Sequence, residues 1–258
     1  MTVRVKRESA VAALYVNMRD ALKNIRVVLC EPHHAGNIGA AARAMKTMGL
    51  DALYLVRPAD FPSHEATRRA SRATDVLAAA RQCDSLHEAL SGTALAVACS
   101  ARTRGLAVPE IDARSAALRL AGAAAVQPVA LVFGNETHGL TTAQTGLCQV
   151  IATIPADPQY ASLNLAAAVQ VFAYEVRLAM VGAAPTQKSR NLASHDALEG
   201  FYAHLESALL DSGYLNPEHP KKLMQRLRRL YARAELEQEE INILRGVVRT
   251  LRQPKIHK

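Results

Sequence analysis

Short apolar runs alternate with longer stretches in which apolar residues recur at helical spacing, from about residue 25 to residue 182. Five of these runs are rich in β-branched residues and predict buried strands. They are IRVVLCEP from Ile25, DALYLVRP from Asp51, TALAVACS from Thr93, VALVFG from Val129 and QVIATIP from Gln149. A strand, a helix and a second strand form a βαβ unit, which builds a parallel sheet through right-handed crossovers. We therefore expect an α/β domain whose parallel sheet carries helices on both faces.

The stretch from Pro155 to Met180 joins a polar, turn-rich loop directly to one long apolar helix. Ser162 and Asn164 stand where a helix N-terminus needs side-chain acceptors, and the helix expected from Leu163 onward has few charged residues. A helix that is apolar nearly all round must be buried on several sides. Its free N–H groups favour polar or anionic ligand groups, so Ser162 and Asn164 are either simple caps or part of an active site.

Two further junctions of this kind follow predicted strands. HHAGNIGAAARAMKTMG, from His33 to Gly49, reads as a glycine-rich turn that leads into a helix. LVFGNETHGL, from Leu131 to Leu140, is a strand that ends in another polar turn. Because ligands bind at the carboxyl ends of the strands in open α/β sheets, these turns are candidate parts of one site.

The pattern changes character after residue 182. Residues 183–194 are small and polar and predict a linker, whereas 195–258 are strongly charged, with apolar residues at helical spacing. We expect a separate small all-α domain there, and a peripheral arm over residues 1–24. The most basic part of the helical domain contains Lys221, Lys222, Arg226, Arg228, Arg229 and Arg233.

The amino-acid composition indicates the class of molecule that this protein binds. The chain has 258 residues, 50% of them hydrophobic, and 31 Lys and Arg against 23 Asp and Glu give a formal net charge of +8. A basic surface attracts polyanions such as RNA. Only 4% of residues are aromatic and none is Trp, so base stacking is not expected to dominate recognition.

The cysteines and the apolar runs indicate the compartment. Cys30, Cys83, Cys99 and Cys148 form no C-x-x-C pair, so neither a metal site nor a disulfide framework is predicted. No apolar run is long enough to span a bilayer. We expect a cytoplasmic protein with reduced thiols, no metal and no membrane segment.

GNIGAAARAMK, LVFGNETHGL and IPADPQYASLNLAAAVQVFAYEVR have the order and separation of the three signature stretches of the SPOUT superfamily of RNA methyltransferases. The resemblance runs from about Ile25 to Met180, and the tail from Phe201 onward is similar to that of a bacterial branch that methylates tRNA. It implies a C-terminal trefoil knot in the parallel-sheet domain and S-adenosylmethionine as cofactor. It further implies 2′-O-methylation of a pyrimidine, cytidine or uridine 32, in the tRNA anticodon loop.

The resemblance also assigns cofactor contacts to particular positions of this chain. They are Cys99, Ser100, Ala101, Gly134, Ile154, Ser162 and Leu163. Small residues at strand ends let backbone amides approach an adenine edge. The chain departs from the family at Cys99, where Thr is common, at Asn135, where Arg is common, and at Ser71–Ala73, where the family has S-G-A. Cysteine in place of threonine removes a hydroxyl group from the cofactor pocket. The departures at Asn135 and Ser71–Ala73 affect positions expected to contact RNA.

Arg43 matches the catalytic arginine of the superfamily. A guanidinium stays protonated in proteins, so we expect Arg43 to bind the neighbouring phosphate and stabilise the developing alkoxide. Ser162 and Asn164 are expected to orient the ribose and the cofactor. Glu136 is the alternative base, although a glutamate in a helix first turn is also explained by the helix dipole.

RNA contacts are expected from two basic groups of residues. Arg102 and Arg104 follow a strand, and the tail adds Lys221, Lys222, Arg226 and Arg229. The long helix from Leu163 is apolar on more faces than one small sheet can cover, and family members pair there. We therefore expect a homodimer in which Arg102 or Arg104 acts across the interface.

Three alternatives remain open at this stage. An rRNA 2′-O-methyltransferase and a non-catalytic RNA-binding relative share the same motifs. A nucleotide-dependent dehydrogenase is disfavoured because GNIG supplies only part of G-x-G-x-x-G. The substrate tRNAs, the proton acceptor and the role of the N-terminal arm are not determined by the sequence.

Overall fold

A computed structural model describes residues 18, 20–100, 109–182 and 191–252. The predicted positions Ala101, Arg102 and Arg104, most of the arm and most of the linker lie outside these ranges. Leu22 is buried in the core of the α/β domain. The folded domain therefore begins before the boundary that the sequence indicated at residue 25.

Seven strands form one entirely parallel sheet in the order β3-β2-β1-β6-β4-β7-β5, which confirms the expected α/β class. The strands are β1 (Ile25–Cys30), β2 (Ala52–Val56), β3 (Arg81–Cys83), β4 (Leu95–Cys99), β5 (Glu110–Asp112), β6 (Val129–Phe133) and β7 (Val150–Thr153). The sequence missed β3 and β5. Each is three residues long, lies at an edge and includes charged residues, so neither shows an apolar run.

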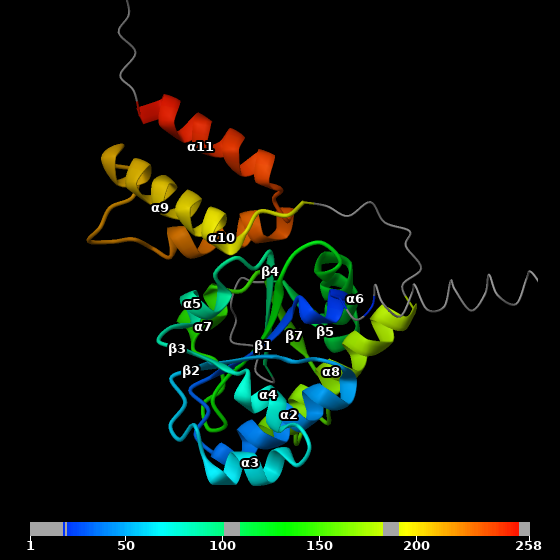
Figure 1. The fold of residues 1–258 in the computed structure, drawn as a ribbon. Helices are drawn as coiled ribbons and strands as arrows, with labels where there is room; N and C mark the ends of the chain where they lie inside the picture. The colour runs from blue at the N-terminus through cyan, green and yellow to red at the C-terminus, as the bar shows by residue number, and fades with distance from the viewer. Residues whose placement is uncertain (1–17, 19, 101–108, 183–190, 253–258) are drawn as a thin grey trace, which may run out of the picture.

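The helices of this domain lie on both faces of the sheet (Figure 1). They are α2 (Ala35–Met48), α3 (His64–Ala70), α4 (Thr74–Ala78), α5 (Leu86–Leu90), α6 (Ala113–Ala124), α7 (Thr142–Gly146) and α8 (Leu165–Gly182). Side chains alternate along β1: Val27 and Leu29 face α2 and α8, whereas Val28 and Cys30 face α5. This period of two explains why both faces of the sheet need apolar residues. The trefoil knot stays a prediction from the family resemblance.

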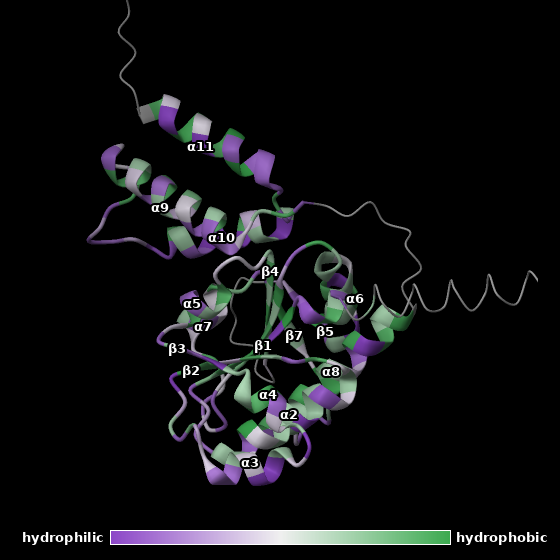
Figure 2. Cartoon of the chain, in the orientation of Figure 1, coloured by the Kyte–Doolittle hydropathy of each residue, from purple (hydrophilic) through white to green (hydrophobic). Residues whose placement is uncertain are grey.

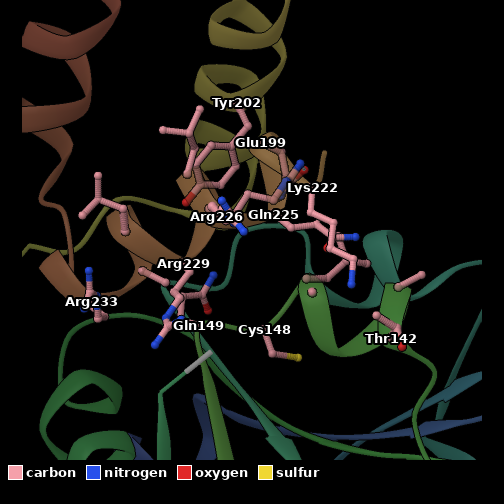
Figure 3. Close-up of a pocket in the computed structure, with 17 residues that line it drawn as sticks. Thr142, Cys148, Gln149, Glu199, Tyr202, Lys222, Gln225, Arg226, Arg229 and Arg233 are labelled. Atoms are coloured by element: carbon pink, nitrogen blue, oxygen red, sulfur yellow. Dashed lines mark hydrogen bonds and ion pairs between the residues drawn. The ribbon is translucent and has the colours of Figure 1, made fainter. Parts of the chain in front are cut away.

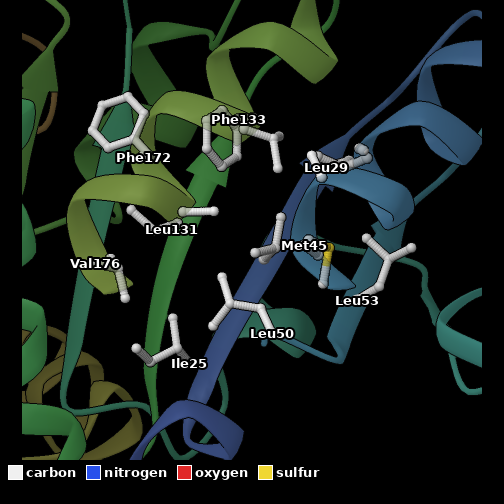
Figure 4. Close-up of a cluster of buried hydrophobic side chains, with 14 of the residues drawn as sticks. Ile25, Leu29, Met45, Leu50, Leu53, Leu131, Phe133, Phe172 and Val176 are labelled. Carbon is white, nitrogen blue, oxygen red and sulfur yellow. The ribbon is translucent and has the colours of Figure 1, made fainter. Parts of the chain in front are cut away.

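Helix α8 is buried as its sequence predicted, and it packs against both α2 and α6. Phe172 and Val176 are almost completely inaccessible, and the Phe172 ring meets Phe133 of β6 edge-on with the ring centroids 5.7 Å apart (Figure 4). Burial of one such large side chain stabilises the fold by about 2 kcal/mol. The helix begins at Leu165, directly after the predicted cap Asn164.

The C-terminal region forms the expected all-α domain from α9 (His195–Asp211), α10 (Leu223–Ala234) and α11 (Gln238–Arg252). Its small core is built around Leu198, Phe201 and Ile241. In Figure 2 these three helices mix hydrophobic and hydrophilic residues along their length, as expected for amphipathic helices around a small core. No residue of α10 is fully buried.

The helical domain docks against the amino-terminal edge of the sheet. The backbone N–H of His195 donates to the Thr93 carbonyl oxygen at 2.6 Å, and the Gly92 N–H donates to Asp196 Oδ2 at 2.8 Å. A second contact is an ion pair in which Arg119 Nη2 of α6 lies 2.6 Å from Oε1 of Glu235, the residue that follows α10. Because Gly92 and Thr93 precede β4, this contact lies at the edge where the parallel strands begin.

The described residues contain neither a membrane-spanning helix nor a metal-binding cluster. No helix among them combines the length and the apolar character needed to cross a membrane. In the same ranges, no cluster of His, Cys, Asp and Glu side chains has the arrangement of a metal site.

Candidate active site

A pocket opens at the carboxyl ends of β4, β6 and β7. It is lined by six of the predicted cofactor positions, namely Cys99, Ser100, Gly134, Ile154, Ser162 and Leu163. Phe133 and Phe172 add apolar walls, and the whole turn from Gly134 to Gly139 forms one side. The six predicted positions are up to 64 residues apart, from Cys99 to Leu163, and they meet because β4, β6 and β7 are parallel neighbours.

Gly134 allows this turn to fold back on itself. A Cβ atom at Gly134 would lie 2.1 Å from the carbonyl carbon of Gly139 and 2.2 Å from the backbone nitrogen of Leu140. The turn is closed by the Gly139 N–H, which donates to the Asn135 carbonyl oxygen at 2.8 Å. Only glycine fits at residue 134, since the obstacle is backbone rather than a movable side chain.

Cys99 occupies the pocket wall at the end of β4. Burial raises the pKa of the Cys99 thiol well above its ordinary value, and the neighbouring Cys148 adds to this effect. The thiol is therefore protonated at neutral pH.

Three polar side chains form a continuous chain of hydrogen bonds beside the pocket. Asn164 Nδ2 donates to Asn37 Oδ1 at 2.9 Å, and Asn37 Nδ2 donates to Glu136 Oε1 at 2.9 Å. The direction is fixed at both ends, because the Glu136 carboxylate only accepts and Asn164 Oδ1 accepts the Ala166 N–H at 2.9 Å. Asn164 is thus both the N-terminal cap of α8 and a member of a network.

Asn37 is the member that sequence reasoning read only as part of a turn and did not assign to the site. It lies in the first turn of α2, opposite the first turn of α8. The available signal was its place in GNIG, where a polar residue stands in the first turn of a helix whose next turn is apolar. Its partner Glu136 is 99 residues away, so the pairing itself leaves no local pattern.

Glu136 is held by donors on two sides. The backbone N–H groups of His33 and His34 donate to its carboxylate at 2.8 and 3.2 Å. Burial by itself would raise the pKa of Glu136, but the hydrogen bonds from Asn37 and from these backbone groups outweigh it and lower the pKa. A carboxylate that accepts this many hydrogen bonds is ionised, and its oxygens already have partners. Glu136 is therefore better suited to positioning its neighbours than to abstracting a proton.

Arg43 lies on the exposed side of α2. One turn earlier the helix is covered instead, because a Cβ at Gly39 would lie 2.0 Å from the Ala66 carbonyl oxygen of α3. Within the described ranges the Arg43 guanidinium has no hydrogen-bond or ion-pair partner. The group is therefore available for an anionic ligand.

The comparisons with known proteins agree with this geometry. The profile described as the SpoU rRNA Methylase family matches residues 24–174, which is more than half of the chain. The chain belongs to the SpoU methylase family. A second profile, the C-terminal domain of the tRNA methyltransferase TrmJ, matches residues 196–257 and thus covers the helical domain.

Individual SpoU relatives cover nearly the whole chain. The tRNA (cytidine/uridine/adenosine-2′-O-)-methyltransferase TrmJ of Pseudomonas aeruginosa is 50% identical over 88% of this chain and 93% of its own length. The tRNA (cytidine/uridine-2′-O-)-methyltransferase TrmJ of Salmonella typhimurium is 47% identical over 90% and 98%. The crystal structure of TrmJ from Z. mobilis superposes with a TM-score of 0.78 at 35% identity, covering 88% of this chain and 99% of that one.

The region that matches the TrmJ C-terminal profile contributes a basic groove to this SpoU protein (Figure 3). Lys222, Arg226, Arg229 and Arg233 of the α10 region line it opposite Thr142 and Gln149 of the α/β domain. The labelled Glu199 is already engaged, since it binds Arg228 of the groove lining in a bidentate ion pair with one contact at 2.7 Å. The structure therefore places three predicted RNA-binding residues, Lys222, Arg226 and Arg229, in one groove, and Lys221 outside its lining.

The basic groove and the pocket lie at opposite edges of the sheet. Gln149, which lines the groove, immediately precedes β7, whereas Ile154, which lines the pocket, follows it. The groove is therefore remote from the candidate chemistry, and its residues can contribute binding without contacting the pocket.

Proposed function

We propose that this chain is a tRNA ribose 2′-O-methyltransferase that uses S-adenosylmethionine and acts in the cytoplasm. The observation that carries the proposal is that two of the three signature stretches line one pocket, and that the third is joined to them beside it by the hydrogen bonds of Asn37 with Asn164 and Glu136. The SpoU family and the TrmJ relatives supply the reaction class.

The residues that line the pocket suit S-adenosylmethionine. Phe133, Ile154 and Phe172 offer apolar contact to a purine, and the turn at Gly134 brings backbone close to the cavity. The residues that would hold the cofactor are Cys99, Ser100, Ala101, Gly134, Ile154, Ser162 and Leu163, of which Ala101 lies outside the described ranges. When bound, this group supplies a methyl carbon that is already activated by its positively charged sulfur.

The protein's own residues would align the ribose and stabilise charge. The ribose 2′-oxygen would have to lie behind the methyl carbon, and holding the ribose in this alignment is the task of the protein's residues. We assign Arg43 to the adjacent phosphate and to the charge that develops on the 2′-oxygen. Ser162 and Asn164 orient the ribose, and Glu136 holds Asn37 against Asn164. The proton passes to the phosphate or to water.

The substrate is proposed as cytidine or uridine 32 of the tRNA anticodon loop. Of the two relatives named above, the name of the Pseudomonas aeruginosa protein includes adenosine and that of the Salmonella typhimurium protein does not. The set of bases that this chain accepts must therefore be measured. Incubation with methyl-labelled S-adenosylmethionine, an unmodified tRNA transcript and an rRNA fragment, followed by mapping of the nuclease-resistant dinucleotide, tests the proposal. Label only in the rRNA would support the rRNA enzyme instead, and label in neither would support a non-catalytic relative.

We propose a homodimer that forms through α8. Tyr174, Leu178 and Val181 follow each other at helical spacing, and their side chains are 49%, 42% and 58% exposed. An apolar stripe on an otherwise buried helix is typical of an interface. It fits the pairing expected from the sequence.

Introducing a charge into this stripe should separate the subunits. Leu178→Glu is expected to shift the mass measured by light scattering from dimer to monomer, because burying an unpaired carboxylate is costly. Leu210→Glu is the matched control, since Leu210 on α9 is 41% exposed and lies outside the stripe. A dimeric Leu178→Glu protein would place the interface elsewhere.

The groove should supply affinity rather than chemistry. We expect the double substitution of Arg226 and Arg229 by alanine to weaken tRNA binding by about 10-fold or more and to reduce the salt slope by about 2, because two phosphate contacts are lost. Alanine at Arg245 and Arg249 on α11 removes the same charge from residues that do not line the groove. Equal weakening by both pairs would mean that only net charge matters.

A further inference from the structure

The chain makes an unusual turn where β1 ends beside the pocket. Glu31 has φ 51°, in the left-handed region that non-glycine residues rarely adopt. Its backbone N–H donates to the Val56 carbonyl oxygen at 2.8 Å, and its carboxylate pairs with Arg57, which is itself at φ 45°. Such a conformation persists only where its surroundings hold it.

Asn135 is one of the groups that hold this turn. Its Nδ2 donates to the Glu31 carbonyl oxygen at 2.8 Å, across 104 residues of sequence. Its Oδ1 accepts the N–H groups of Thr137 and His138 at 2.8 and 3.3 Å. One side chain thus shapes the pocket turn with its oxygen and ties that turn to the end of β1 with its nitrogen.

Glu136, the residue after Asn135, completes the connection to α2. Glu136 receives the N–H groups of His33 and His34, which lie between the Glu31 turn and the first residue of α2. Asn135 and Glu136 therefore join the pocket turn to the β1–α2 loop at three backbone positions. The start of α2, with Asn37, is placed by these contacts.

We propose that Asn135 is a positioning residue for methyl transfer, whose oxygen shapes the cofactor pocket and whose nitrogen fixes the β1–α2 loop and hence α2. The inference rests on the proposed methyl transfer. It predicts that the two halves of the amide have separable effects, one on cofactor affinity and the other on the rate of the chemical step.

The chain offers a close control. Asn24 Nδ2 donates to the Ala124 carbonyl oxygen at 2.8 Å, across 100 residues and also in a partly buried place, but at the opposite edge of the sheet. Asn24→Ala removes the same kind of hydrogen bond without touching the pocket. Any effect shared by Asn24→Ala and Asn135→Ala reports stability alone.

Three variants test the proposal in the full-length protein. Asn135→Asp keeps the oxygen acceptor and loses the donor, so we expect affinity for S-adenosylhomocysteine within about 3-fold of wild type by calorimetry, with kcat at saturating tRNA lowered about 10-fold. Asn135→Ala should lower both. Hydrogen exchange should show faster exchange of the His33 and His34 amides in both variants, and Asn24→Ala should change neither kcat nor this exchange.

The outcomes are distinguishable from failure of the proposed function. If wild type does not methylate tRNA, the proposed function fails, whereas the exchange and calorimetric results still report on the loop. If wild type is active and Asn135→Asp keeps its kcat and its amide protection, the positioning role is overturned. The same holds if Asn135→Asp loses as much cofactor affinity as Asn135→Ala.

Discussion

Replacing Arg43 by alanine should lower the single-turnover rate of methyl transfer by at least ~100-fold at saturating tRNA, as expected for loss of a group that stabilises transition-state charge. The fold should survive, because the side chain is exposed and has no partner within the described ranges. Calorimetric affinity for S-adenosylhomocysteine should stay close to that of wild type. The result to measure is therefore a loss of rate without a loss of cofactor binding.

Arg43→Lys separates charge from geometry. Lysine keeps the positive charge but lacks the planar fork that binds a phosphate through two N–H groups, so continued loss of rate would show that bidentate placement matters. Lys46→Ala is the control on the same helix, since the Lys46 ammonium already binds Asp75 at 2.7 Å and the Arg72 carbonyl oxygen at 2.8 Å. Wild-type turnover in both Arg43 variants, or parallel loss of cofactor affinity, would remove Arg43 from the catalytic role.

Gly134→Ala should abolish measurable cofactor binding and lower the free energy of unfolding by about 3 kcal/mol, the upper range for forcing an atom into a packed site. The added Cβ would overlap the backbone at Gly139 and Leu140, so the pocket turn must open. Calorimetry with S-adenosylhomocysteine and denaturant unfolding measure the two effects.

Gly146→Ala is the matched control for this substitution. A Cβ at Gly146 meets no atom within 4 Å, and the residue ends the short helix α7. Alanine there should be neutral or slightly stabilising, because it restricts the unfolded chain. A Gly134→Ala protein that binds cofactor normally would contradict the tight turn seen in the structure.

The sequence predicted those parts of the fold that have a local physical signal. Runs such as that of β1 are buried on both faces and are therefore apolar apart from Arg26, and α8 is covered on several sides and therefore apolar nearly all round. Strand β5 lacks this signal, because an edge strand of three residues is held by pairing with β7 rather than by its own composition. Strand β5 therefore forms because of its tertiary pairing and not because of its local sequence.

The candidate site was predictable position by position but not as a network. Gly134, Ser162 and Asn164 stand at strand ends or helix starts, which the pattern of elements locates. The link from Asn164 through Asn37 to Glu136 depends on side chains brought together by the order β1-β6 in the sheet. The family resemblance supplied the role of Arg43, since an exposed arginine on a helix has no distinguishing pattern of its own.

The protonated thiol of Cys99 has a consequence for the durability of the enzyme. A thiol reacts with oxidants and alkylating agents chiefly as its thiolate, so a thiol that stays protonated reacts slowly. The buried wall of the pocket raises the pKa of this thiol well above its ordinary value. The same burial that shapes the pocket therefore keeps the Cys99 thiol poorly reactive.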